Sequence, residues 1–182
     1  MLGIQLDENV RHKITRAKGH FYAKFLLVRD GSADNNFISF MYDSGAWITV
    51  LSRKVYERNK LNALPWKPFS MSGYGAGVDE SRTVPGFIYQ IPALKIGQRL
   101  LTEVWAFTPA SYEISENILG GNAIEYFNTY QDNGNDCFYF FDNPDPKPYI
   151  HEATGFSLKC GGSFSLDEGK ERLKCPTSLS KQ

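Results

Sequence analysis

The fold of this chain is decided by residues 37–51, which read Phe37-Ile38-Ser39-Phe40-Met41-Tyr42-Asp43-Ser44-Gly45-Ala46-Trp47-Ile48-Thr49-Val50-Leu51. The run before Asp43 is rich in aromatic and aliphatic residues, as a β-strand is. A carboxylate follows on a Ser-Gly turn, and a second strand-like run begins at Ile48. Taken alone, Asp-Ser-Gly is typical of an ordinary turn. Its place between two apolar runs predicts instead an acid presented at the end of a strand.

Length and composition predict a folded domain with extensions. The chain has 182 residues, of which 42% are hydrophobic and 14% aromatic, far from the composition of a disordered chain. Its 20 basic and 20 acidic residues cancel, and no basic stripe is evident, so we expect no nucleic-acid partner.

Neither a membrane span nor a secretory signal is expected. No window holds the roughly 18 apolar residues that a span requires, and residues 1–8 lack a basic region followed by an apolar core. Cys137, Cys160 and Cys175 are an odd number without a close pair, which favours a reducing compartment or at most one bridge. We therefore expect a cytoplasmic protein without a membrane partner. The alternative that a leader is removed from a longer precursor stays open.

The rest of the chain has mainly strand-like patterns. Strands are predicted over residues 21–28, 83–91, 93–96 and 100–107, with a hairpin turn over 132–135. The helical spacing of Val10, Ile14 and Ala17 predicts a short helix or an arm. A second short helix is expected after Ser52, capped by that residue, and a third after an apolar strand end at Leu119.

A second motif lies seventy-seven residues (120 − 43) after the first, in the stretch Asn117-Ile118-Leu119-Gly120-Gly121-Asn122. Together with Asp43-Ser44-Gly45-Ala46, Thr49-Val50-Leu51 and Thr108-Pro109, it resembles the two signatures of the retroviral-type aspartic proteases, the retropepsins. The resemblance covers roughly residues 21–141. It implies an all-β acid-protease barrel with one or two short helices, one lobe per chain, that works as a homodimer.

The resemblance also implies roles for individual residues. Asp43 would be the catalytic acid, with one copy from each subunit, Ser44 would fix the loop by a hydrogen bond across the dimer, and Gly45 would let the substrate backbone approach. Two carboxylates about 3 Å apart share one proton, which is the known behaviour of aspartic-protease dyads. Neither a metal nor a cofactor is needed.

The hairpin over residues 72–87 would be a flap, with its tip near Asp79 and Glu80, and its glycines would permit the movement of a lid. An extended polypeptide would pair with it as an added strand. Apolar pockets would be lined by residues such as Val50 and Ile118. The expected substrate-binding residues are therefore Ala46, Trp47, Val50, Gly75, Gly77, Asp79, Glu80 and Ile118.

The chain departs from the family at several positions. Trp47 and Ile48 stand where retroviral enzymes carry acidic residues that bind the substrate backbone, so cleavage preference does not transfer. Gly121 replaces a basic residue that supports the dimer, and the flap tip is acidic rather than glycine-rich. Trp47 also has a simpler interpretation, as a core or interface aromatic.

We expect an N-terminal arm or extension over 1–19, a protease domain over 20–142 and an extension of unknown role over 143–182. His151, Cys160 and Cys175 lack the close ligand pairs of structural zinc sites, so no metal is expected. The predicted function is an aspartic endopeptidase acting on extended polypeptides. Two alternatives remain, a peptide- or protein-binding module with little turnover and a structural β-domain with a fortuitous motif.

Overall fold

A computed structural model describes residues 10–28, 36–61, 66–72, 83–112 and 114–146, together with four short strand segments nearer the C-terminus. The main sheet contains β1 (Arg11–Ala17), β2 (His20–Val28), β3 (Phe37–Tyr42), β4 (Thr49–Val50), β5 (Trp66–Ser72), β6 (Thr83–Ile96), β7 (Arg99–Pro109), β8 (Ile118–Leu119), β9 (Phe127–Asp132) and β10 (Cys137–Asp142). The described part also has two short helices, α1 (Arg53–Arg58) and α2 (Gly121–Ile124). Two strand pairs follow, β11 (Ile150–His151) with β12 (Phe156–Ser157), and β13 (Ser165–Leu166) with β14 (Leu173–Lys174).

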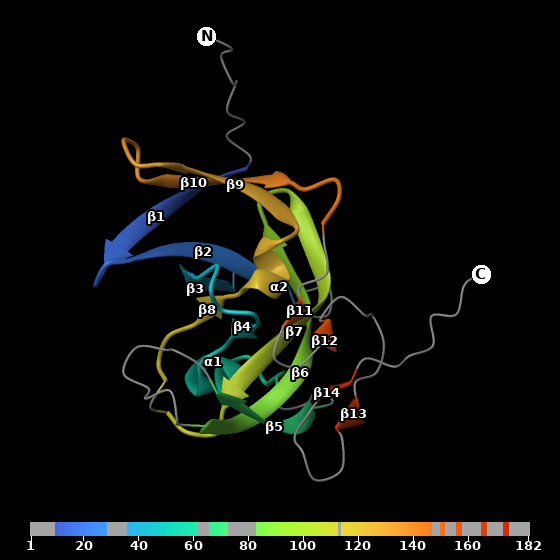
Figure 1. Cartoon of the computed structure of the whole chain (residues 1–182). Helices are drawn as coiled ribbons and strands as arrows, with labels where there is room; N and C mark the ends of the chain where they lie inside the picture. Colours follow the sequence, from blue (N-terminus) through green and yellow to red (C-terminus); the bar gives the residue numbers. More distant parts are fainter. Residues whose placement is uncertain are drawn as a thin grey trace, which may run out of the picture.

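The sheet closes into a barrel (Figure 1). Its strand order is β5-β6-β7-β4-β8-β3-β2-β1-β10-β9, and an additional antiparallel pairing of β2 with β6, from Leu26↔Lys95 to Val28↔Ala93, joins its two halves. Strands β1, β10 and β9 extend beyond this closure and lie across one end of the barrel, at the top of Figure 1. The predicted all-β barrel with short helices is therefore confirmed.

Alternating burial explains why these segments are strands. In β2, Ala23, Phe25 and Leu27 are buried, while Lys24 between them is exposed. Since successive strand residues point to opposite faces, one face of β2 enters the core. There the ring of Phe25 meets that of Phe140 edge-on at 5.3 Å between centroids. Burying such a side chain stabilises the fold by about 1.5–3 kcal/mol.

A second, smaller cluster of buried residues lies between the β5–β6 hairpin and the strands that follow Asp43. It consists of Ile48, Val50, Phe69, Ile88, Trp105 and Phe107, with Trp47, Met71, Val84 and Ile118 packed against it. This apolar cluster connects the hairpin to the predicted site loop.

Three local predictions differ from the structure. Residues 11–17 form strand β1, not a helix, because β1 pairs with β2 on one side and β10 on the other. The predicted strands over 83–91 and 93–96 are one strand, β6, that runs through Pro92. Helix α1 begins after Ser52 as expected, but the Ser52 side chain makes no capping hydrogen bond.

Other local predictions are confirmed. They include strands β2, β3 and β7, the β9–β10 hairpin turn and the change from strand to helix after Leu119. The predicted domain boundaries stay predictions, although β1 lies within the sheet and its Ile14 belongs to the core.

Candidate active site

Asp43 lies directly after strand β3, on a turn whose tip is exposed. Its backbone N–H donates to the Leu119 carbonyl at 3.2 Å, and its carbonyl accepts from the Ala46 N–H at 3.2 Å. Its Oδ1 accepts from the Gly45 N–H at 2.9 Å. Asp43 is half-buried, whereas Ser44 and Gly45 are exposed. The turn thus orients the acid through its own backbone and leaves the acid within reach of solvent.

The strands on both sides of this turn are held by β8. Strand β3 runs parallel to β8, with Tyr42 opposite Leu119, and β4 meets β8 at the pair Val50↔Ile118. A second parallel pairing joins β4 to β7, with Val50 opposite Phe107. The two ends of the loop are therefore fixed to one short strand, which makes the loop rigid at its base.

The two sequence motifs are in contact at Gly120. A Cβ added there would lie 2.3 Å from the carbonyl carbon and oxygen of Ile48 and 2.8 Å from the Thr49 nitrogen, so no side chain fits. The next residue, Gly121, donates its N–H to the Ala46 carbonyl at 2.6 Å. Glycine at position 120 is required because the backbone after Asp43 passes directly against it.

Asn122 supports the loop from the same side. Its Oδ1 accepts from the N–H and the hydroxyl of Thr49, and its Nδ2 donates to the Trp105 carbonyl at 2.7 Å. Asn122 is 6% exposed and Thr49 is fully buried. Sequence reasoning noticed Asn122 only as part of the motif and gave it no role.

A third set of polar residues lies behind the loop, and sequence reasoning gave these residues no role either. The Thr108 hydroxyl donates to the Leu51 carbonyl at 2.8 Å, which leaves its oxygen to accept from the Tyr89 hydroxyl at 2.7 Å. Burial raises the pKa of Tyr89. The Asn117 side chain accepts from the Ser52 N–H and donates to the Ser39 carbonyl. The sequence contained a signal for these contacts in Thr108-Pro109 and Asn117. Polar residues at the ends of apolar strands often form hydrogen bonds with the backbone.

Of the predicted substrate-binding residues, Trp47 is half-buried and packs edge-on against Phe69 of β5 at 6.1 Å between centroids. This agrees with its simpler interpretation as a packing aromatic. Val50 is 2% exposed and belongs to the smaller buried cluster. Ala46 and Ile118 are half-buried beside the loop. Their roles toward a substrate stay predictions.

The hairpin predicted as a flap is present as the antiparallel pair β5–β6, whose register runs as far as Ser72↔Thr83. Its connecting segment, with Gly75, Gly77, Asp79 and Glu80, lies outside the described residues. The lid role of the hairpin therefore stays a prediction.

Within the described ranges, no group of three or more His, Cys, Asp or Glu side chains could hold a metal ion. Cys137 is buried and free, while Cys160 and Cys175 lie outside those ranges. No helix in the described part of the chain is long and apolar enough to cross a membrane.

Comparisons with known proteins give likenesses among solved structures but none in sequence. No protein-family model matches the sequence, and a search of curated proteins finds no match either. Among solved structures, the chain is similar to a retropepsin-like aspartic protease from Rickettsia conorii, with 18% sequence identity and a TM-score of 0.48. The match covers 72% of this chain and 87% of that protein.

Proposed function

We propose that this protein is an aspartic endopeptidase that cleaves extended polypeptides and works as a homodimer. The observation that carries the proposal is the Asp43 turn. The half-buried Asp43 follows strand β3, and its carboxylate accepts the Gly45 N–H at 2.9 Å. Gly120 and Asn122 support the segment after the turn, at Ile48 and Thr49. Such rigid backing is what a catalytic acid needs to keep its geometry.

The chain carries one Asp-Ser-Gly motif, so a two-carboxylate site needs a second copy. Paired across a twofold axis, the two Asp43 side chains would share one proton. The ionised carboxylate takes a proton from a water, whose oxygen attacks the scissile carbonyl carbon. The protonated carboxyl gives its proton to the carbonyl oxygen. Collapse of the tetrahedral intermediate breaks the C–N bond, and the amine leaves with a proton returned by the dyad.

The surroundings of Asp43 favour an extended substrate. Ser44 and Gly45 are exposed at the tip of the turn, and the absence of a Cβ on Gly45 allows a backbone to approach. The β5–β6 hairpin joins the same apolar cluster as Trp47 and Ile118. A peptide held between the hairpin and the turn would pair by main-chain hydrogen bonds, with apolar side chains toward this cluster.

One observation favours a second candidate, a peptide-binding module with little turnover. Trp47 packs against Phe69, and Val50 is buried, so the protein's own side chains fill space after the Asp43 turn. A filled pocket would limit the positioning of a scissile bond without preventing a peptide from binding.

The test is cleavage of an unfolded protein by the wild type and by Asp43→Asn, between about pH 4 and 7 and at several protein concentrations. Asp145→Asn is the matched control, because Asp145 is exposed and distant in sequence from the turn. The proposal predicts activity that is lost in Asp43→Asn, unchanged in Asp145→Asn, and higher per molecule at higher concentration. Peptide binding without cleavage by the wild type would instead support the binding module.

A further inference from the structure

A polar cavity lies where β1 meets the β9–β10 hairpin. Its volume is about 460 Å³, and the described residues that line it are Arg11, Lys13, Asn135 and Cys137. Pockets that bind small molecules occupy about 300–1,000 Å³. The cavity is therefore large enough for a small organic molecule, and it shares no residue with the candidate active site.

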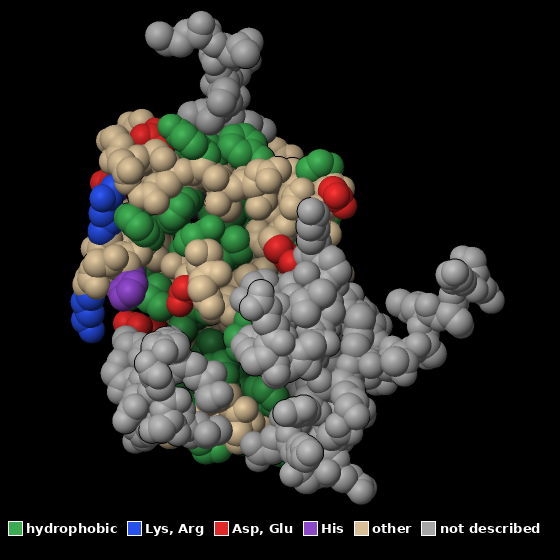
Figure 2. All heavy atoms as spheres, viewed as in Figure 1, with side chains coloured by type: hydrophobic (Ala, Val, Ile, Leu, Met, Phe, Trp, Pro, Cys, Tyr) green, Lys and Arg blue, Asp and Glu red, His purple; other side chains and the backbone are tan. Residues whose placement is uncertain are grey.

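Strand alternation places the two basic side chains of the cavity on one face of the sheet. Arg11 and Lys13 are alternate residues of β1, so they point to the same side. His12 between them points to the opposite side, where its ring contacts Phe25 and Phe140 of the core. The cavity thus opens on the outer face. In Figure 2, the Lys and Arg side chains that are visible lie along the margin next to β1, at the left of the view.

Cys137 holds the Arg11 side chain in position. In the β1–β10 register Cys137 stands opposite Lys13. Its Sγ accepts from Arg11 Nε at 3.0 Å and donates to the Asn135 carbonyl at 3.1 Å. A thiol that donates its proton is neutral, so it orients the guanidinium without cancelling the positive charge. Because Cys137 is buried, this wall of the cavity is fixed.

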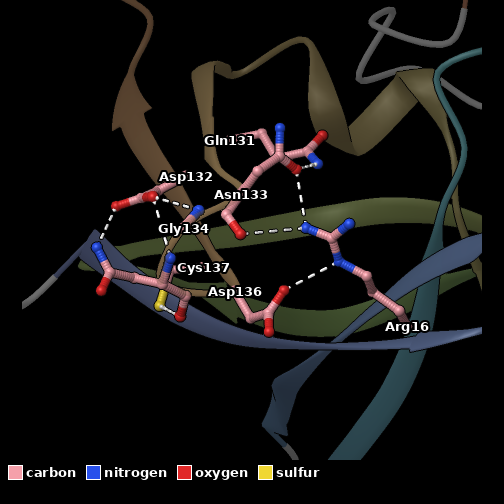
Figure 3. Close-up of polar contacts among 8 residues, drawn as sticks. Arg16, Gln131, Asp132, Asn133, Gly134, Asp136 and Cys137 are labelled. Atoms are coloured by element: carbon pink, nitrogen blue, oxygen red, sulfur yellow. Dashed lines mark hydrogen bonds and ion pairs between the residues drawn. The ribbon is translucent and has the colours of Figure 1, made fainter.

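The wall that contains Asn135 is fixed by the β9–β10 turn, which Figure 3 shows. Asp132 accepts from the Gly134 N–H at 2.9 Å and from the Asn135 N–H at 3.1 Å. Its second oxygen accepts from Asn135 Nδ2 at 2.7 Å. From β1, Arg16 donates through Nε to Asp136 at 2.9 Å. The turn is therefore ordered without a ligand, and an ordered site loses less entropy when it binds one.

The charge around the cavity is positive. As alternate residues of a strand, Arg11 and Lys13 lie about 6.5–7 Å apart along β1, so their charges repel. One carboxylate interacts with this pair. A hydrogen bond from the Asn135 side chain lowers the pKa of Asp132 most, and the charge of Arg11 lowers it further. For the Lys13 ammonium, no hydrogen-bonding or acidic partner is found among the described residues. An anion between the two cations would relieve their repulsion.

We propose that this cavity binds a small organic molecule through an oxyanion, either a phosphate or a carboxylate group. The Arg11 guanidinium and the Lys13 ammonium donate charge-assisted hydrogen bonds to the oxyanion, and the planar guanidinium suits both groups. The rest of the molecule lies beside Asn135. Because the ligand binds the folded junction of β1 and β10, it stabilises the fold. Binding here is independent of the proposed protease activity.

The test is isothermal titration calorimetry of the full chain at about pH 7.5, where the lowered pKa of His12 keeps the neighbouring ring neutral. The probes are inorganic phosphate, glycerol 3-phosphate and succinate at constant ionic strength, and glycerol is the matched neutral probe. We expect saturable binding of at least one anion, no binding of glycerol, and a higher melting temperature with the anion that binds. Binding of the phosphates alone identifies a phosphate site, and binding of succinate alone identifies a carboxylate site.

Two substitutions locate the binding in the cavity. Lys13→Gln and Arg11→Gln should each weaken it by at least about tenfold, because each removes a charge-assisted hydrogen bond. Lys54→Gln is the matched control, since Lys54 is exposed on α1, far from β1 in Figure 1, and it should leave binding unchanged. Circular dichroism checks folding. If Arg11→Gln is unfolded, Lys13→Gln decides alone, because the Lys13 ammonium has no described partner to lose.

The outcomes separate this site from the proposed function. The anion site is overturned if none of the three anions binds, or if folded Lys13→Gln binds as tightly as the wild type. Equal losses in Lys13→Gln and Lys54→Gln would indicate a general attraction of surface charge and would also overturn it. Because none of these measurements uses cleavage, an inactive protein that binds the anion supports the site, and an active protein that does not bind it keeps the protease proposal.

Discussion

Thr49 and Asn122 are joined by two hydrogen bonds although they lie 73 residues apart in sequence. The Asn122 Oδ1 accepts from the Thr49 N–H at 2.8 Å and from its hydroxyl at 2.9 Å. Because a neutral amide makes these contacts, the strand after Asp43 is braced without another charge near the carboxylate. The strength of this brace can be measured.

Asn122→Ala should lower the free energy of unfolding strongly. It removes every partner that Asn122 provides to Thr49 and Trp105 and leaves buried polar groups unsatisfied, at about 1–3 kcal/mol each. Denaturant unfolding measures the loss, and Asn128→Ala, at an exposed position, should change stability by less than about 0.5 kcal/mol. Equal effects of the two substitutions would contradict the brace.

Gly120→Ala should also destabilise the fold, because its Cβ would overlap the Ile48 carbonyl at 2.3 Å. Since the obstacle is backbone, the strands must separate, at a cost of about 1–3 kcal/mol or more. Gly134→Ala is the control, because its Cβ would meet only the Asp132 side chain, at 3.4 Å. Thermal unfolding of the two variants distinguishes them, and a Gly120→Ala protein as stable as the wild type would refute the close contact.

His12 should make stability depend on pH. Burial lowers the pKa of His12, and a hydrogen bond to the Lys24 backbone offsets only part of this effect. Its Nε2 accepts from the Gly97 N–H at 2.9 Å, which requires the neutral ring. The folded state therefore binds the proton less readily than the unfolded state, whose histidine pKa is about 6.5.

The stability that neutral His12 provides is complete above about pH 6.5 and decreases as the pH falls from there through the lowered folded pKa. Denaturant unfolding between about pH 5 and 8 should show this slope in the wild type, and His12→Gln should reduce it. His20→Gln, at an exposed position, should keep it. An unchanged slope in His12→Gln would assign the pH dependence to other groups.

Trp47→Ala should alter substrate preference if the proposed protease is correct. The substitution removes the ring that packs against Phe69 and opens space next to the Asp43 turn. We expect KM to fall for peptides with large apolar residues and to rise or stay equal for peptides with small ones. The free energy of unfolding should decrease by less than the loss of about 3–5 kcal/mol that truncation of a fully buried Trp causes. A peptide series with one varied apolar position measures this, and identical KM ratios in both proteins would place Trp47 outside the substrate site.

Much of the fold could be predicted from local pattern. Aromatic and aliphatic runs identified β2, β3 and β7, and Asp132-Asn133-Gly134-Asn135 identified the β9–β10 turn. Residues 11–17 were predicted wrongly because Val10, Ile14 and Ala17 happen to follow helical spacing. Pairing with β2 and β10 overrides that weak preference.

By itself, the sequence determined that Asp43 follows a strand on a Ser-Gly turn and that Gly120 belongs to a second motif, because both are encoded by neighbouring residues. Only the tertiary structure decided that these motifs touch, that Asn122 braces Thr49, and that His12 is half-buried with its Nε2 accepting from Gly97. It also decided that β9 is left at an edge beside Tyr42. Such contacts join residues that are far apart along the chain, and they exist only once the barrel closes, so no local pattern specifies them.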